Sequence, residues 1–272
     1  MIKLFTMVKD ESDIIKDWIL YHGFLFGYDN LFIIDNMSED GTYEIINEFN
    51  EYGIHIYRES DYCKKGEFMR RLINMYCNED DVAFPIDIDE FIVYHERGMK
   101  NVNCDKNTIN NYINGLGNIA SIYKANYLLC MITQKDGYER AVCENKWSIY
   151  SDYGSHAKSF FRVDLYNGPI DHGNHIVCGN GYYVSNICLV HFHCRNLEQM
   201  KKKVLNNITG LGYANDLNLL RDLIRNSPNC NGNHHVRHQI NILEGGYRLE
   251  SWTPEEHFID LSELNNYLSK IN

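Results

Sequence analysis

Residues 84–93 of the 272-residue chain read FPIDIDEFIV. The stretch places Asp87, Asp89 and Glu90 within four positions and flanks them with apolar residues. Unpaired carboxylates are costly to bury, and neighbouring like charges repel each other. In an extended segment, residues two apart face the same side, so Asp87 and Asp89 are predicted to point together. Such a D-x-D pair suits a hard divalent ion, Mn²⁺ or Mg²⁺, although a solvated acidic turn is the alternative.

Upstream of this stretch, apolar runs alternate with segments of helical periodicity. Strands are predicted at IKLFTMV (2–8), NLFIIDN (30–36), IHIYRE (54–59) and VAFPI (82–86). Helices are predicted between them, over residues 9–27, 43–53 and 65–77. This alternation predicts an α/β fold whose mostly parallel central sheet is flanked by helices.

Polar residues follow three of the predicted strands directly. In open sheets of this class, ligands bind outside the carboxyl ends of the strands. The first, second and fourth strands therefore deliver polar groups to one edge: Lys9, Asp10 and Glu11; Asp35 and Asn36; and Asp87 and Asp89. We expect a ligand site at this edge.

The composition excludes several classes of function. A formal net charge of −11 argues against a nucleic-acid partner, which requires a basic surface. No apolar run reaches the roughly 18 residues of a membrane span. The apolar stretch at the N-terminus is too short for a secretory signal. Nine scattered cysteines without a CxxC pair indicate reduced thiols. A cytoplasmic location is therefore expected.

Three segments in order resemble the motifs of one enzyme group. They are KDESDIIKDWILYHGFLFGYDNLFIIDNMSEDGT (9–42), IDIDEF (86–91) and HFHCRNLEQMKKK (191–203). The group is the family 2-like and family 92-like glycosyltransferases of the GT-A fold. The resemblance is close over residues 3–95 and loose over 147–203.

The resemblance implies a nucleotide-sugar donor, most often a UDP-sugar, bound with Mn²⁺ or Mg²⁺, and a hydroxyl of a glycan or other molecule as acceptor. It implies roles for six residues: Thr6, Val8 and Glu11 around the nucleobase and ribose, Asp35 on the uracil ring with Asn36 beside it, and Asp87 near the ribose and metal. Asp89 would bind the metal directly.

His191 and His193 end the apolar run ICLVHFH, and strand alternation places both on one side. They are either metal ligands that complete the site of Asp89 or ordinary strand histidines. The family usually has Ser where Asn196 stands, and Arg195 replaces a Lys or other polar residue. Arg195 is predicted to clamp the diphosphate.

An inverting sugar transfer needs a carboxylate base near the acceptor. Asp171 and Asp152 are the candidates by position, and a turn aspartate is the alternative for each. Lys65 or Arg70 is predicted to approach the diphosphate, unless both lie on a solvated helix face.

The predicted organisation is a GT-A domain over residues 1–205 and a helical extension over 206–272 packed on it. Within the domain, residues 1–95 form the nucleotide-binding half and residues 96–205 the acceptor half. Helical periodicity dominates after residue 196, and no further strand is expected.

Two other functions fit parts of this pattern. A sugar nucleotidyltransferase also uses a parallel sheet and metal carboxylates, but its first loop is usually rich in glycine, whereas TMVKDES (6–12) has none. A carbohydrate-binding relative without catalysis would keep the fold. The D-x-D and H-x-H motifs favour the metal-dependent glycosyltransferase.

Overall fold

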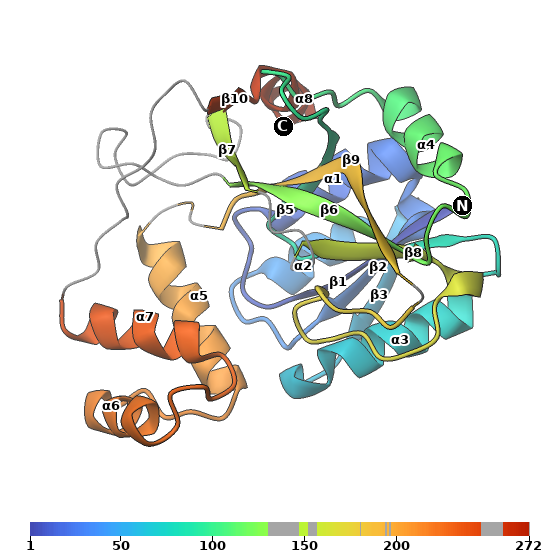
Figure 1. Ribbon diagram of the computed structural model, residues 1–272. Helices are drawn as coiled ribbons and strands as arrows, with labels where there is room; N and C mark the ends of the chain where they lie inside the picture. The colour runs from blue at the N-terminus through green and yellow to red at the C-terminus, as the bar shows by residue number, and fades with distance from the viewer. Residues whose placement is uncertain are drawn as a thin grey trace.

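The computed structural model describes residues 1–129, 147–151, 157–179, 181–193, 195, 197–245 and 258–271. The described strands form one sheet with the order β10-β7-β6-β8-β4-β1-β2-β3, to which β9 is joined by pairing with β6, and β5 by pairing with β9 (Figure 1). Helices cover both faces of the sheet, and α5, α6 and α7 gather beside it (Figure 1).

The first half of the chain forms the parallel part of the sheet. Its strands are β1 (Ile2–Val8), β2 (Leu31–Asp35), β3 (His55–Arg58) and β4 (Val82–Pro85), all paired in parallel. The helices α1 (Ile15–Phe26), α2 (Thr42–Glu48) and α3 (Lys65–Tyr76) connect them. Every residue of β1 and β2 is buried, as expected for strands covered on both faces. The predicted α/β class is confirmed.

The second half contributes mainly antiparallel strands. These are β5 (Glu90–Tyr94), β6 (Ile122–Leu129), β7 (Trp147–Ser151), β8 (Lys158–Arg162) and β9 (Tyr182–His191). Only β6 and β9 among them pair in parallel. Helix α4 (Lys106–Gly115) precedes β6. Because β8 pairs antiparallel with β4, this half extends the sheet directly next to the acidic stretch.

The acidic stretch is a turn between two strands, which corrects the prediction of one extended segment. Strand β4 ends at Pro85 and β5 begins at Glu90, and the Glu90 amide donates to the Asp87 carbonyl at 3.2 Å. The side chains of Ile86 and Ile88 are buried and anchor the turn. Strand alternation therefore does not apply to Asp87 and Asp89, and the two carboxylates have different partners.

Helix α1 fixes β5 through the side chains of its W-x-x-Y-H motif. Trp18 Nε1 donates to the Glu90 carbonyl at 3.1 Å, and Tyr21 Oη donates to the Ile92 carbonyl at 2.7 Å. The Ile92 amide donates to His22 Nε2 at 3.2 Å, so His22 Nδ1 carries the proton and donates to the Trp18 carbonyl. All three side chains are buried. The motif is structural: it holds the strand that directly follows the acidic turn.

Separate apolar cores lie on the two faces of the sheet. The larger includes Trp18 of α1, Ile109 of α4 and Leu264 of α8. The second lies under α3 and includes Phe5 and Met69. Face-to-face burial of this kind is the main stabilising term of such a layered fold.

The C-terminal region forms its own small core before the chain returns to the sheet. Helices α5 (Leu197–Gly210), α6 (Leu217–Asn226) and α7 (Asn233–Leu243) confirm the predicted helices, and they share a core of Ile208, Leu220 and Val236. The prediction that no strand follows is wrong, because β10 (Phe258–Asp260) pairs antiparallel with β7. A strand of three residues is too short to show periodicity. Helix α8 (Ser262–Ile271) completes the chain.

No helix in the described part of the chain is both long enough and apolar enough to cross a membrane.

His22 makes the stability of the fold depend on pH. Burial lowers the pKa of His22 from 6.5 to about 3. Between these values the unfolded chain binds the proton and the folded chain does not, so stability is complete above pH 6.5 and falls as the pH drops. Acidification from pH 7 to 5 should therefore cost about 2 kcal/mol through His22 alone. Urea unfolding at both pH values should show this extra loss in the native chain relative to His22→Gln. An equal loss in the two proteins would contradict it.

Candidate functional site

A cavity of about 430 Å³ opens at the carboxyl ends of β1, β2 and β4. Its sheet side carries residues from all three loops predicted to converge: Lys9 and Glu11, Asn36, and Asp87 and Asp89. Its other side is lined from α5, from the start of α7 and from the turn at residues 171–175. The cavity therefore lies between the parallel half of the sheet and the helical group.

Asp87 is held by two buried lysines. Lys65 Nζ lies 2.5 Å from Asp87 Oδ1, and Lys158 Nζ lies 2.6 Å from Asp87 Oδ2. Burial alone would raise the pKa of the Asp87 carboxyl, but the two ammonium groups outweigh it and hold the pKa far below its usual range. The side chain of Lys158 is 1% exposed, whereas that of Asp87 is 34% exposed and faces the cavity. Asp87 thus presents an ionised carboxylate at a fixed position.

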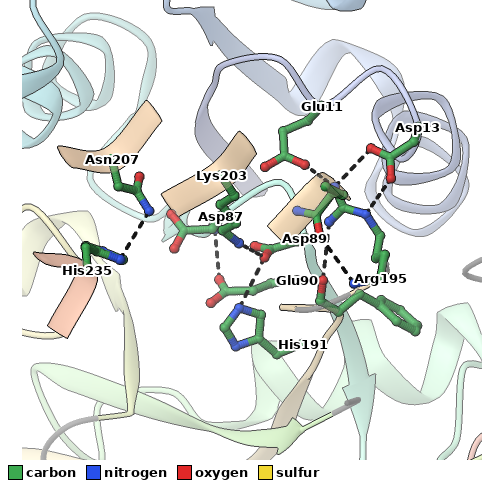
Figure 2. A network of polar contacts seen from close by, with 12 residues as sticks. Glu11, Asp13, Asp87, Asp89, Glu90, His191, Arg195, Lys203, Asn207 and His235 are labelled. Carbon is green, nitrogen blue, oxygen red and sulfur yellow. Dashed lines mark hydrogen bonds and ion pairs between the residues drawn. The ribbon is translucent and has the colours of Figure 1, made fainter. Parts of the chain in front are cut away.

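Asp89 lies deeper and has a different set of partners. Its Oδ2 accepts a hydrogen bond from the Lys203 ammonium, and His191 Nε2 lies 3.3 Å from the same oxygen (Figure 2). Burial would raise the pKa of Asp89, but Lys203 and His191 outweigh burial and keep the carboxyl ionised. Burial would lower the pKa of Lys203, and Asp89 and Glu11 outweigh that effect and raise it. The two side chains form a largely buried ion pair in the lining of the cavity.

Asp89, His191 and His193 together form a possible metal site. One ligand atom from each lies within 4.8 Å of the others, and no other such group of three occurs in the described part of the chain. Burial lowers the pKa of His193 well below its usual range, so its imidazole is in the neutral form that binds metals. His191 Nδ1 is buried without a partner among the described residues. The donor set fits a divalent ion, and two imidazoles favour Mn²⁺ over Mg²⁺, which prefers oxygen ligands.

The structure brings most of the predicted site residues to one cavity. Nine line it: Val8, Glu11, Asn36, Lys65, Asp87, Asp89, Asp171, His191 and His193. Asp87 does not belong to the metal-binding group of three. Thr6, Asp35, Arg70 and Arg195 do not line the cavity. Asp152 lies outside the described residues.

Asp35 and Thr6 are buried beneath the loops they were predicted to serve. Asp35 accepts from the Ser38 amide at 3.1 Å and from Arg58 Nε at 3.0 Å. It therefore shapes the loop after β2, whose next residue, Asn36, reaches the cavity. Thr6 is fully buried within β1. Position after a strand predicted the right loop for Asp35, but it did not predict which side chain opens to solvent.

Arg195 faces two carboxylates rather than the cavity. Its Nε donates to Asp13 Oδ2 at 2.7 Å, its Nη1 donates to the Phe192 carbonyl at 3.2 Å, and its Nη2 donates to Glu11 (Figure 2). The side chain of Arg195 is 2% exposed. Arg195 thus ties the segment after β9 to the loop after β1. The exposed Arg70 lies on α3, on the solvated face that was the alternative for it.

Asp171 organises the turn that closes one side of the cavity. Its Oδ1 accepts from the Ile176 amide at 2.7 Å, and its Oδ2 accepts from the Gly173 amide at 3.3 Å. The turn packs closely on the first residues of α3, where a Cβ on Gly66 would lie 2.2 Å from the Ile170 carbonyl oxygen. The turn and Lys65 are therefore fixed relative to each other.

Several residues in and around this cavity were not among the predicted site residues. Lys158 and Lys203 pair with the two aspartates, and His172, His175 and His235 line the far wall. Burial lowers the pKa of His175 to about 4, with Lys158 as the next cause, and that of His235 to about 3, with His234 as the next cause. Both imidazoles are therefore neutral at pH 7. The segment MKKK (200–203) gave no sign of which lysine turns inward. Only the packing of α5 decides this.

Comparisons with known proteins give partial matches. No family model matches the chain. Over 55 residues the chain is 36% identical to a glycosyltransferase family 92 protein of Ricinus communis. The matched segment is 20% of this chain and 9% of that protein. This match confirms the resemblance predicted from the motifs.

Two solved structures show distant similarity. One is glucosyl-3-phosphoglycerate synthase of Mycobacterium tuberculosis with Mn²⁺ and UDP-glucose, at 17% identity and TM-score 0.32 over 47% of this chain and 43% of that one. The other is a mannosyltransferase of Pyrobaculum calidifontis with GDP-mannose and Mn²⁺, at 9% identity and TM-score 0.48 over 99% and 85%. The chain thus spans less than half the length of the curated and mycobacterial proteins.

Loss of the Lys158 charge should destabilise the folded chain. In Lys158→Met the side chain keeps its length but leaves Asp87 and the buried Glu90 short of one counter-charge. The free energy of unfolding should fall by about 2–3 kcal/mol. This is at or just below the lower end of the range for removal of one partner of a buried pair, because Asp87 reaches solvent. Urea denaturation measures the change.

Lys64→Met is the matched control. Lys64 is 56% exposed and pairs with Asp61 at the surface, so its loss should cost less than about 1 kcal/mol. Equal effects of the two substitutions would show that the Lys158 pair contributes no more than a surface pair.

Proposed function

We propose that the chain is a metal-dependent glycosyltransferase of the GT-A type that moves a sugar from a nucleotide-sugar donor, a UDP-sugar, to a hydroxyl of a glycan or other acceptor. One observation carries the proposal: Asp89, His191 and His193 form a metal-binding group beside Asp87, in a cavity at the carboxyl edge of a parallel sheet. That edge is where such sheets bind nucleotides.

Asp89, His191 and His193 would hold Mn²⁺, which supplies positive charge for the diphosphate leaving group. The charge is needed because the lysines that reach Asp87 and Asp89 are already paired with these carboxylates. Lys65 and Lys158 lie on Asp87, and Lys203 lies on Asp89. Without a divalent ion, this part of the cavity has little net attraction for a diphosphate.

The chain's own residues would position the donor. Asp87 presents a fixed carboxylate that can accept hydrogen bonds from ribose hydroxyls, and two lysines prevent it from turning away. Val8 and Asn36 line the same side of the cavity, where the nucleobase would lie. Glu11 is held by Arg195, so the loop after β1 is fixed before any ligand arrives. Such preorganisation reduces the cost of binding.

We assign the base of an inverting transfer to Asp171. Four carboxylates line the cavity, on Glu11, Asp87, Asp89 and Asp171. The first three pair with a Lys or Arg side chain, and Asp171 has no ion pair among the described residues. A carboxylate without a fixed cation is the better proton acceptor. Residues 1–95 would then form the nucleotide half, and residues 96–205 with the helices after 206 would face the acceptor.

Asp89→Asn should abolish Mn²⁺-dependent binding of UDP. Calorimetric titration of UDP should show binding to the native chain with Mn²⁺, weaker binding with Mg²⁺, and little binding with EDTA. The substitution removes the one anionic ligand, so affinity in Mn²⁺ should fall at least about 100-fold. Asp80→Asn, at a carboxylate that is 96% exposed, serves as the control and should bind UDP normally. Failure of UDP, and of GDP in a parallel titration, to bind with Mn²⁺ would refute the donor site.

A further inference from the structure

The position of Lys203 bears on how a metal ion enters the site. Its ammonium donates to Asp89 Oδ2, which is the oxygen that His191 Nε2 approaches at 3.3 Å. Figure 2 shows Lys203 and His191 reaching this carboxylate from different elements, α5 and the end of β9. A divalent ion bound by Asp89, His191 and His193 would occupy the space beside the same Asp89 carboxylate. The lysine and the metal are therefore competitors for one carboxylate.

A metal ion and the Lys203 ammonium cannot share this space at low cost. The side chain of Lys203 is 17% exposed and that of Asp89 is 2% exposed, so solvent screens the two cations poorly. The other nearby carboxylate, Glu11, already accepts from Arg195. When a metal takes Asp89, Lys203 loses the carboxylate that it pairs with and becomes available to another anion.

Lys203 can reach an anion within the cavity. It lines the cavity together with Lys9, Asn206 and the metal-binding residues. A lysine has a flexible four-carbon stem, so its ammonium can move several ångströms without movement of α5. The diphosphate of a nucleotide bound next to the metal would supply the anion.

We propose that Lys203 is an exchangeable counter-ion: it neutralises Asp89 in the empty site, is displaced by the divalent ion, and then binds the diphosphate of the donor. The inference rests on the proposed function for the identity of the anion. It goes further by making Lys203 couple the two ligands. Metal binding alone separates Lys203 from Asp89, whereas the diphosphate of a bound nucleotide gives the Lys203 ammonium a new anionic partner. Because such coupling is reciprocal, UDP should strengthen Mn²⁺ binding as much as Mn²⁺ strengthens UDP binding.

The test is a calorimetric titration of MnCl₂ into the chain at pH 7.5, with and without saturating UDP. Lys203→Met and Lys203→Gln remove the competing charge. Without UDP, both should bind Mn²⁺ at least about tenfold more tightly than the native chain. The factor by which UDP improves Mn²⁺ affinity should fall by a similar amount, because Lys203 no longer links the two ligands.

Lys201→Met is the matched control. Lys201 lies on the same helix, is 41% exposed and pairs with Glu198, so the substitution makes the same change in net charge away from the cavity. It should leave both affinities unchanged. A rise equal to that of Lys203→Met would show a general charge effect and overturn the exchange.

The remaining outcomes also decide the matter. Unchanged Mn²⁺ affinity in both Lys203 variants overturns the proposal, even though UDP still binds with Mn²⁺ and the proposed function stands. Binding of UDP in EDTA with no Mn²⁺ binding to any variant also overturns it, since Lys203 would then replace the metal permanently. Should Lys203→Met not fold without metal, recovery of its thermal unfolding transition on addition of Mn²⁺ supports the exchange, and no recovery with either ion or nucleotide opposes it.

Discussion

The structure depends on one electrostatic constraint: the turn between β4 and β5 carries two carboxylates, one of them buried and the other only partly exposed to solvent. Their charges are balanced by lysines from three distant elements, Lys65 of α3, Lys158 of β8 and Lys203 of α5. A buried ion pair adds little net stability, but removal of one partner is costly. The turn therefore fixes α3, β8 and α5 relative to one another, because each of them forms an ion pair with it. The shape of the cavity follows from that arrangement.

The second support of the turn is the main chain of β5. Helix α1 bonds to this strand through Trp18, Tyr21 and His22, and β9 bonds along its other edge. Strand β9 ends at His191, opposite Glu90, so the two metal-binding elements leave the sheet side by side. Asp89 and His193 lie just outside these strands, and the Phe192 amide donates to the Asp89 carbonyl at 2.8 Å, so backbone hydrogen bonds hold the residues of the proposed metal site together. This placement is the rigidity that a binding site requires.

Much of the first half of this fold could be predicted from the sequence, because its strands and helices are long enough to show their periodicity. The three converging loops followed from strand order alone, and so did the edge at which Asp87 and Asp89 lie. The sequence failed where long-range packing decides. The acidic stretch is a turn because β5 pairs with β9, about a hundred residues later. Arg195 lies on Glu11 and Asp13, and Lys203 turns inward among three consecutive lysines, for reasons that only the tertiary structure contains.

The helical group beside the sheet has a core of its own, made by Ile208, Leu220 and Val236. It shares the cavity with the sheet, yet the described residues of its core are separate from the two cores that hold the sheet together. Sequence change in α6 and α7 can therefore accumulate without loss of the central architecture. Natural selection can alter the far wall of the cavity, with its neutral imidazoles and amides, while the carboxylate turn stays as it is. The ligands that the cavity accepts can then diverge through changes in the helical group alone.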